Sequence, residues 1–189
     1  MAKSTHKKRC IYVGIDPGMQ GAVAALDDDG FLGVWDTPTL TISKGKTKKG
    51  NAKHQHKYAA AQMVDILEGA RFNHTALGMR TGTPSPCVIG LELVHSMPGQ
   101  GATSMFSMGR GTGLWEGIIA ALRLPSQQVT PQAWKKMLMG GETGKTKQAS
   151  IVVAQRLFPK ASAFLSRKKD DGRADAILIA EYVRRGNQK

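Results

Sequence analysis

Two acidic side chains stand inside apolar stretches of the sequence, where a carboxylate is costly. Asp16 ends the run 10–16 (CIYVGID), and Glu92 lies within the run 87–94 (CVIGLELV). A buried carboxylate is unfavourable unless it is paired, hydrogen-bonded or bound to a metal. Each residue taken alone could equally be a strand-end acid that caps backbone amides. The two become candidates for a site when they are considered with the other acids of the chain.

A second pair of acids opens the C-terminal helical pattern. Asp171 and Asp175 are four residues apart, so their side chains share one helical face, where like charges repel unless a cation lies between them. A capping role for Asp170 or Asp171 is the alternative. Carboxylate oxygens are the ligands that Mg²⁺ prefers. Four carboxylates can hold two such ions about 4 Å apart, the arrangement that hydrolyses phosphodiesters.

The charge balance of the chain points to a polyanionic partner. The 189 residues include 27 Lys and Arg against 14 Asp and Glu, a formal net charge of +13. Nucleic acid is the first candidate partner for so basic a chain. Four acids gathered in one place on such a chain favour a metal-dependent nuclease. The 41% apolar content excludes wholesale disorder.

Several other classes of protein are not indicated. No apolar run reaches the roughly 18 residues of a membrane helix, and the spacing of Cys10 and Cys87 is not that of a metal site. The tripeptide 144–146 (GKT) lacks the glycine that a phosphate-binding loop needs five residues earlier, where Met139 stands. We therefore expect no membrane contact and no nucleotide cofactor. The absence of a secretion signal predicts a cytoplasmic protein of a bacterial or phage-infected cell, or an organelle-matrix protein whose leader has been removed.

Hydrophobic patterning predicts an α/β architecture with a mixed sheet. Strands are expected at 10–16, 22–26, 31–35, 87–94 and 127–129, and helices at 58–70, 113–123, 133–139, 147–157 and 173–185. The first three strands, joined by short turns, form an antiparallel meander. We expect a basic tail at 1–9, one domain at 10–185 with a lysine-rich loop at 37–57, and a short tail at 186–189.

The acidic motifs resemble those of a known family. The residues Gly14–Gly18 (GIDPG), with Gly21 and Ala22, resemble the first-strand motif of the RuvC-type Holliday junction resolvases of the RNase H-like superfamily. The stretch 89–94 (IGLELV) resembles their fourth-strand glutamate motif. The stretch 168–180 (KKDDGRADAILIA) resembles their last-helix aspartate motif, particularly in phage-encoded and plastid members. The three motifs occur in the family's order.

The resemblance implies an RNase H-like five-stranded mixed sheet flanked by helices, and a homodimer that nicks four-way DNA junctions symmetrically. It implies two Mg²⁺ ions, with Mn²⁺ as a substitute, held by Asp16, Glu92, Asp171 and Asp175. It also places Lys147, and Lys135 as a second lysine, near the scissile phosphate, with the neighbouring Lys145 and Lys136 as the alternatives. A RuvC-like nuclease acting more broadly on flaps and forks is one alternative. A non-catalytic protein that binds DNA junctions is another.

Basic and aromatic residues are the expected DNA contacts. His95 stands where many bacterial members carry an aromatic wedge, and Phe106, expected in a loop, could stack at the junction instead. The other expected contacts are Arg110, Lys135, Lys136, Lys145, Lys46, Lys48 and Lys49. Trp115 and Trp134 are interpreted as packing anchors. The helix at 113–123 is a candidate dimer face, although burial against the sheet would explain its apolar residues as well.

Overall fold

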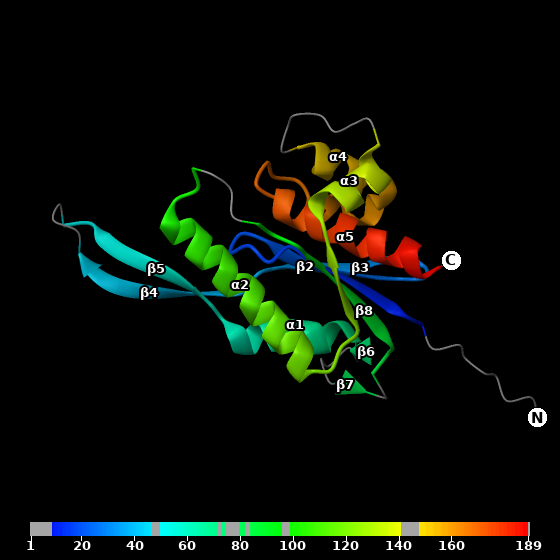
Figure 1. Cartoon of the computed structure of the whole chain (residues 1–189), viewed down its shortest axis with the longest axis horizontal. Coiled ribbons are helices and arrows are strands. Elements are labelled where there is room, and N and C mark those ends of the chain that lie inside the picture. The colour runs from blue at the N-terminus through cyan, green and yellow to red at the C-terminus, as the bar shows by residue number, and fades with distance from the viewer. Residues whose placement is uncertain are drawn as a thin grey trace, which may run out of the picture.

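A computed structural model of the chain describes residues 9–46, 50–71, 73–74, 80–81, 84–95, 99–140 and 148–188. Its centre is one five-stranded sheet in the order β3-β2-β1-β8-β9 (Figure 1). These strands are β1 (Ile11–Ile15), β2 (Ala22–Asp27), β3 (Gly30–Asp36), β8 (Cys87–Glu92) and β9 (Ser126–Val129). The strands β1, β2 and β3 pair antiparallel, whereas β8 is parallel to β1 and β9 is parallel to β8. The predicted mixed sheet with three antiparallel opening strands is confirmed.

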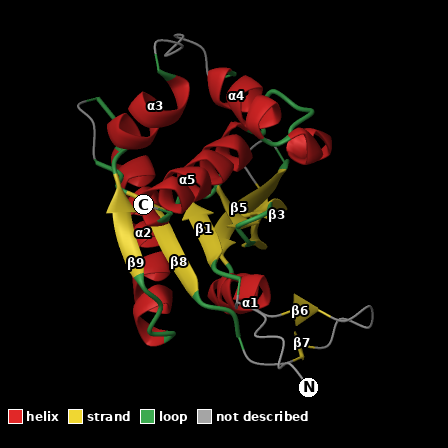
Figure 2. Ribbon diagram, turned by 90° about the vertical axis from the view of Figure 1, so that its right-hand side faces the viewer, coloured by secondary structure: helices red, strands yellow, loops and turns green. Residues whose placement is uncertain are grey.

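Helices cover both faces of this sheet (Figure 2). Helix α5 (Asp171–Asn187) lies across one face with α3 (Pro131–Met139) and α4 (Ala149–Leu157) beyond it, and α1 (Ala60–Arg71) and α2 (Ala102–Ala121) lie on the other. A short 3₁₀ helix spans Pro159–Phe164. Successive strand side chains point to opposite faces, which creates two apolar cores. Within the described residues, no helix is long and apolar enough to span a membrane.

The lysine-rich segment is a hairpin, so the prediction of a loop at 37–57 is wrong. Strands β4 (Thr39–Lys46) and β5 (Ala52–Tyr58) pair antiparallel and extend away from the body of the molecule (Figure 1). Nearly all of their side chains are exposed or half-exposed. Such a ribbon has no buried face, so its sequence lacks the alternation of apolar and polar residues by which a strand is normally predicted. A separate pair of short strands, β6 (Asn73–His74) and β7 (Arg80–Thr81), was likewise not predicted.

Helix α2 begins at Ala102, eleven residues before the predicted start at 113. Phe106 is therefore on a helix and not in a loop. The glycines of this segment suggest a loop, but Gly111 is in a helix and is glycine because the helix packs closely at this position. A Cβ atom there would lie 2.3 Å from the Tyr58 hydroxyl oxygen and 2.6 Å from the carbonyl oxygen of Pro17. The glycine lets α2 pack directly against the loop that follows β1.

Candidate active site

The sheet brings Asp16 and Glu92 together at the ends of two adjacent parallel strands. Ile15 of β1 pairs with Leu91 of β8, and each acid is the next residue along its strand. Neighbouring strands lie about 4.8 Å apart. Two carboxylates that are 76 residues apart in the chain therefore stand side by side at one edge of the sheet.

Two glycines allow α5 to approach these strands closely. Gly14 and Gly90 are partners in the β1–β8 register. A Cβ atom at Gly14 would lie 2.1 Å from the carbonyl oxygen of Ala176, and one at Gly90 would lie 2.5 Å from Cγ2 of Val183. Backbone atoms of the helix thus occupy the space that a side chain on β1 would need. This close packing explains why position 14, in the first acidic motif, is occupied by glycine.

The close approach places Asp16 against the first turn of α5. A Cβ atom at Gly172 would lie 3.1 Å from Asp16 Oδ2, and Gly172 stands between Asp171 and Asp175 in the sequence. On its other side, Asp16 Oδ1 accepts a hydrogen bond of 3.0 Å from the backbone N–H of Gly18. The carboxylate is therefore fixed between the loop after β1 and the start of α5.

The environment of the strand-end acids disfavours their ionised forms. The pKa of Asp16 is raised to about 6, chiefly by burial and in smaller part by the charges of Asp175 and Asp171, while the hydrogen bond from Gly18 opposes the shift. Burial likewise raises the pKa of Glu92 to about 7, with contributions from Asp16 and Asp175. A hydrogen bond from Trp134 and the charge of Lys135 act in the opposite direction. The acids affect one another electrostatically, as members of one site do.

Asp175 is a buried acid with one carboxylate oxygen that has no hydrogen-bond partner among the described residues. Burial raises its pKa, and a hydrogen bond from Ser150 and the charge of Lys135 oppose the shift. Its Oδ1 atom is nevertheless buried with no hydrogen-bond partner within the described residues. A buried carboxylate oxygen without a partner is unfavourable, and a cation would satisfy it.

This donor set fits a divalent cation in its chemistry. It consists of hard oxygen atoms, carries excess negative charge and includes one unsatisfied buried oxygen. Among the described residues, no three His, Cys, Asp or Glu side chains are gathered closely enough to hold a metal ion as they stand.

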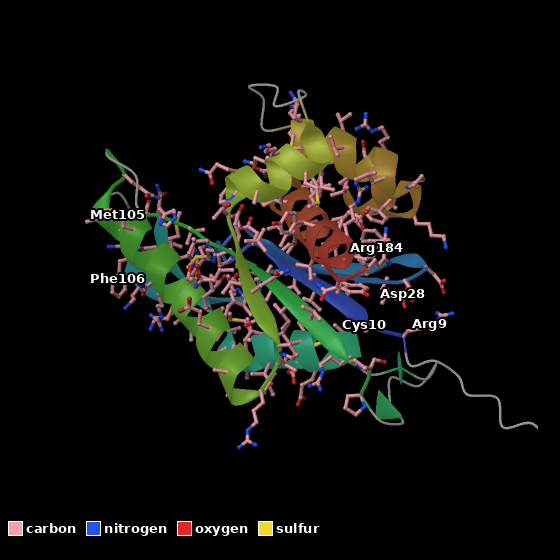
Figure 3. All side chains as sticks on the ribbon, turned by 45° about the vertical axis from the view of Figure 1, so that its right-hand side comes forward. Arg9, Cys10, Asp28, Met105, Phe106 and Arg184 are labelled. Carbon is pink, nitrogen blue, oxygen red and sulfur yellow. The ribbon has the colours of Figure 1, made fainter. Side chains whose placement is uncertain are left out.

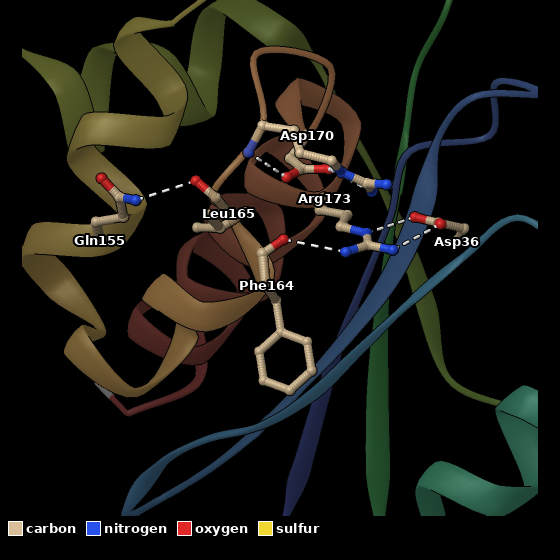
Figure 4. Close-up of polar contacts among 7 residues, drawn as sticks. Asp36, Gln155, Phe164, Leu165, Asp170 and Arg173 are labelled. Atoms are coloured by element: carbon tan, nitrogen blue, oxygen red, sulfur yellow. Dashed lines mark hydrogen bonds and ion pairs between the residues drawn. The ribbon is translucent and has the colours of Figure 1, made fainter.

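The start of α5 is held by its own polar contacts, which involve none of the four predicted metal ligands (Figure 4). Arg173 makes a two-pronged ion pair with Asp36 at the end of β3, with 2.7 Å between Nη2 and Oδ2, and donates from Nη1 to the carbonyl oxygen of Phe164. Asp170 accepts hydrogen bonds from the backbone and guanidinium of Arg167. Burial raises the pKa of Asp170, but the Arg167 contacts outweigh it and hold the pKa below its usual value. Asp170 makes no side-chain capping bond.

Most of the predicted DNA contacts that the structure describes lie on exposed surface, whereas Lys135 is close enough for its charge to act on Glu92 and Asp175. Phe106 is 74% exposed and lies with Met105 at one end of α2, far from the Arg9, Asp28 and Arg184 side (Figure 3). Arg110 is exposed on the same helix, His95 is exposed three residues after Glu92, and Lys46 is exposed at the end of β4. On α3, Lys136 is exposed and Lys135 is half-buried. The predictions for Lys48, Lys49, Lys145 and Lys147 lie outside the described residues.

Two contacts of the site were not predicted from the sequence. Trp134, interpreted as a packing anchor, is fully buried but also donates a hydrogen bond of 3.0 Å from Nε1 to Glu92 Oε1. The Tyr58 hydroxyl, at the base of the hairpin, donates to the carbonyl oxygen of Ser107 on α2 at 3.1 Å. Both bonds join segments that are distant in sequence, so no local pattern could have indicated them.

Strand order, strand direction and the acids at the strand ends together define the class of protein. A five-stranded mixed sheet whose first three strands are antiparallel, with helices on both faces and acids at the ends of adjacent central strands, is an RNase H-like fold.

The comparisons with known proteins identify a sequence relative among junction resolvases. The Holliday junction resolvase MOC1 of the chloroplast of Chlamydomonas reinhardtii is 30% identical over 157 residues, which cover 79% of this chain. The chain spans 17% of that protein's length. No protein-family model matches the chain. The chain is thus a sequence relative of a plastid junction resolvase, and the predicted resemblance to RuvC-type resolvases is confirmed.

Two solved structures of Thermus thermophilus RuvC are also similar. One has a TM-score of 0.49 at 15% identity, and the other, a complex with a Holliday junction substrate, has a TM-score of 0.48 at 10% identity. Each comparison covers 93% of this chain and 96% of the RuvC chain. The superpositions are loose, and the fold assignment rests on the strand order and directions given above.

Proposed function

We propose that the protein is a structure-specific endonuclease that resolves four-way DNA junctions by Mg²⁺-dependent hydrolysis. The observation that carries the proposal is the meeting of Asp16 and Glu92 with the start of α5, which bears Asp171 and Asp175. This cluster of acids lies in a chain of net charge +13. The sequence relationship to a plastid junction resolvase supports four-way junctions as the substrate.

In this proposal the four carboxylates hold two Mg²⁺ ions, or Mn²⁺ in their place. Held there, the ions would supply the Lewis acidity that hydrolysis of a phosphodiester requires. The backbone N–H of Gly18 keeps Asp16 oriented. Lys147 is proposed to approach the scissile phosphate. Lys135, whose charge acts on Glu92 and Asp175, is proposed as a second cation beside the DNA.

The basic surface is proposed to hold the junction by its phosphates. The β4–β5 hairpin extends from the body and exposes Lys44, Lys46 and Lys53, and no acidic residue occurs between positions 37 and 64. Backbone contacts of this kind position DNA without reading its sequence. The remaining proposed contacts are Lys48, Lys49, Arg110, Lys136 and Lys145. Phe106, exposed on α2, is proposed to stack on a base at the branch point, and His95 is proposed as a further DNA contact.

Symmetric cleavage of a symmetric substrate requires two sites, so we propose a twofold homodimer. The candidate face on α2 is in part accounted for by the core, since Ile118 and Ile119 are buried. Gly113, Gly117 and Ala120 remain exposed on the same helix. The compartment is proposed to be a bacterial or phage-infected cytoplasm, or an organelle matrix such as that of the chloroplast relative.

One observation favours broader specificity as a second candidate function. His95, exposed three residues beyond Glu92, stands where many bacterial resolvases carry an aromatic wedge. If a histidine at this position selects four-way junctions less strictly than an aromatic residue does, the protein would also cut flaps and forks.

The test is cleavage of an end-labelled four-way junction, a fork and a linear duplex, with and without Mg²⁺. The wild-type protein is compared with Asp16→Asn and with Asp29→Asn, a control acid that is exposed and paired with Arg9. We expect paired symmetric nicks in the junction that require Mg²⁺ and are lost only in Asp16→Asn. Equal cutting of the fork would support the broader nuclease. Tight junction binding with no cutting in Mg²⁺ or Mn²⁺ would contradict the nuclease proposal and indicate a non-catalytic DNA-binding protein.

A further inference from the structure

Two tryptophans are fully buried on opposite faces of the sheet, and they differ in what their indole N–H groups contact. Trp115 of α2 lies in one apolar core, and its Nε1 has no hydrogen-bond partner within the described residues. Trp134 of α3 lies in the other core, and its Nε1 donates to Glu92 Oε1 at 3.0 Å. Trp115 therefore makes only packing contacts among the described residues, whereas Trp134 also donates a hydrogen bond to one of the predicted metal ligands.

The chain places Trp134 over Glu92 by a short and well-defined route. Val129 at the end of β9 is the register partner of Glu92. Thr130 then caps α3, its side chain accepting a hydrogen bond of 3.2 Å from the Ala133 N–H, and Pro131 begins the helix. One turn later the chain has returned to the same strand end. The indole is thus positioned by the sheet register and by the helix cap together.

The contact restricts the carboxylate of Glu92. An indole N–H can only donate, so Glu92 Oε1 is the acceptor in this bond, and the fully buried ring cannot rotate away without disturbing the core. Holding Oε1 in this way leaves Oε2 as the oxygen free to bind another partner. On the outer side, Lys135 Nζ lies 5.0 Å from the centroid of the Trp134 ring, at the distance of a cation–π contact.

We propose that Trp134 is a positioning residue, which through its indole N–H orients Glu92 so that the second carboxylate oxygen faces a divalent cation. This inference rests on the proposed metal-dependent function. Groups that orient a metal ligand typically change metal affinity by about 10- to 100-fold when they are removed. Trp134 would thereby set how much Mg²⁺ the protein needs without touching the metal or the DNA.

The test compares Trp134→Phe with Trp115→Phe, a matched pair in which each variant loses an indole from a fully buried position. The affinity of the DNA-free protein for Mn²⁺ is measured by isothermal titration calorimetry, and the Mg²⁺ concentration for half-maximal junction cleavage is measured separately. Trp134→Phe should weaken both about 10- to 100-fold, with much of the cleavage rate restored at saturating Mg²⁺. Trp115→Phe should change neither. Thermal unfolding should show a lower Tm in both variants, which separates packing from positioning.

Equal Mn²⁺ affinity in the wild type and Trp134→Phe would overturn the inference. Mn²⁺ binding weakened to the same extent in Trp115→Phe would overturn it as well. If Trp134→Phe does not fold, benzothienylalanine at position 134, which keeps the ring shape and replaces N–H by sulfur, provides the same comparison. A wild-type protein that binds Mn²⁺ but cuts no junction would refute the proposed function, while a weaker affinity in Trp134→Phe would still support the positioning role.

Discussion

The acidic strand ends and the basic hairpin are built in opposite ways. Asp16 is enclosed by the loop after β1 and the first turn of α5, with glycines where the contacts are tightest. The β4–β5 hairpin is exposed along most of its length and is anchored at its base by Tyr58. Chemistry at a phosphodiester requires carboxylates fixed within fractions of an ångström, whereas phosphate contacts act through charge over longer distances. Single substitutions near the strand ends should therefore have large effects on stability or cleavage, whereas single substitutions on the hairpin should each change DNA affinity only slightly.

The largest effect is expected where α5 meets β1. Gly14→Val would place side-chain atoms against the helix backbone at Ala176, which cannot move without shifting the whole of α5. Overpacking usually costs about 1–3 kcal/mol, and we expect this site to exceed about 3 kcal/mol because the opposing atoms are backbone. Urea unfolding measures the change. The control is Gly113→Ala, where the added Cβ meets nothing within 4 Å and helix propensity predicts a gain of up to about 1 kcal/mol.

A smaller effect is expected from the clamp between Arg173 and Asp36. The bond from Arg173 lowers the pKa of Asp36 below its usual 3.8. Its stabilisation should therefore be fully present above pH 3.8 and should be lost as the pH falls below that value. A double-mutant cycle with Arg173→Gln and Asp36→Asn should give a coupling energy of about 1 kcal/mol or less near pH 7, because Asp36 is largely exposed. A coupling energy that did not decrease as the pH was lowered from 7 through 3.8 and below would contradict this account.

The clamp also links stability to cleavage. Because Arg173 fixes the turn that carries Asp171 and Asp175, its loss should lower the junction cleavage rate more than it lowers junction affinity. Arg185→Gln on the same helix, which removes one of the two partners of Glu181 at the far end, is the control that should leave cleavage unchanged.

The smallest effects per residue are expected on the hairpin. Lys46→Ala or Lys53→Ala should weaken junction binding only modestly and should reduce the slope of log affinity against log salt by about 1 each. Thermal stability should not change, since both side chains are exposed. Fluorescence anisotropy at several salt concentrations measures the slope. Ser43→Ala on the same hairpin is the uncharged control, and a slope unaltered by both lysine substitutions would remove the hairpin from the DNA-binding surface.

The sequence predicts the enclosed region well and the exposed region poorly, for the same physical reason. Strands β1, β2 and β8 lie in the middle of a covered sheet, so their burial produces continuous apolar runs, against which Asp16 and Glu92 stand out. The hairpin has no core face and leaves no such pattern. The sequence predicts too short a helix α2 because Gly109 and Gly111 suggest a loop, whereas Gly111 is required by close packing and Gly109 faces open space. The bond from Trp134 to Glu92 depends on the β8–β9 register, which local sequence does not specify.

The central claim is that the strand ends and the start of α5 form one metal site. Its most direct measurement is a crystal structure of the protein soaked in Mn²⁺ near pH 8, with anomalous scattering used to locate the ions. We expect anomalous peaks bounded by Asp16, Glu92, Asp171 and Asp175, with Asp175 Oδ1 among the ligands and the Trp134–Glu92 hydrogen bond retained. Peaks elsewhere on the surface, with these carboxylates unligated, would contradict it.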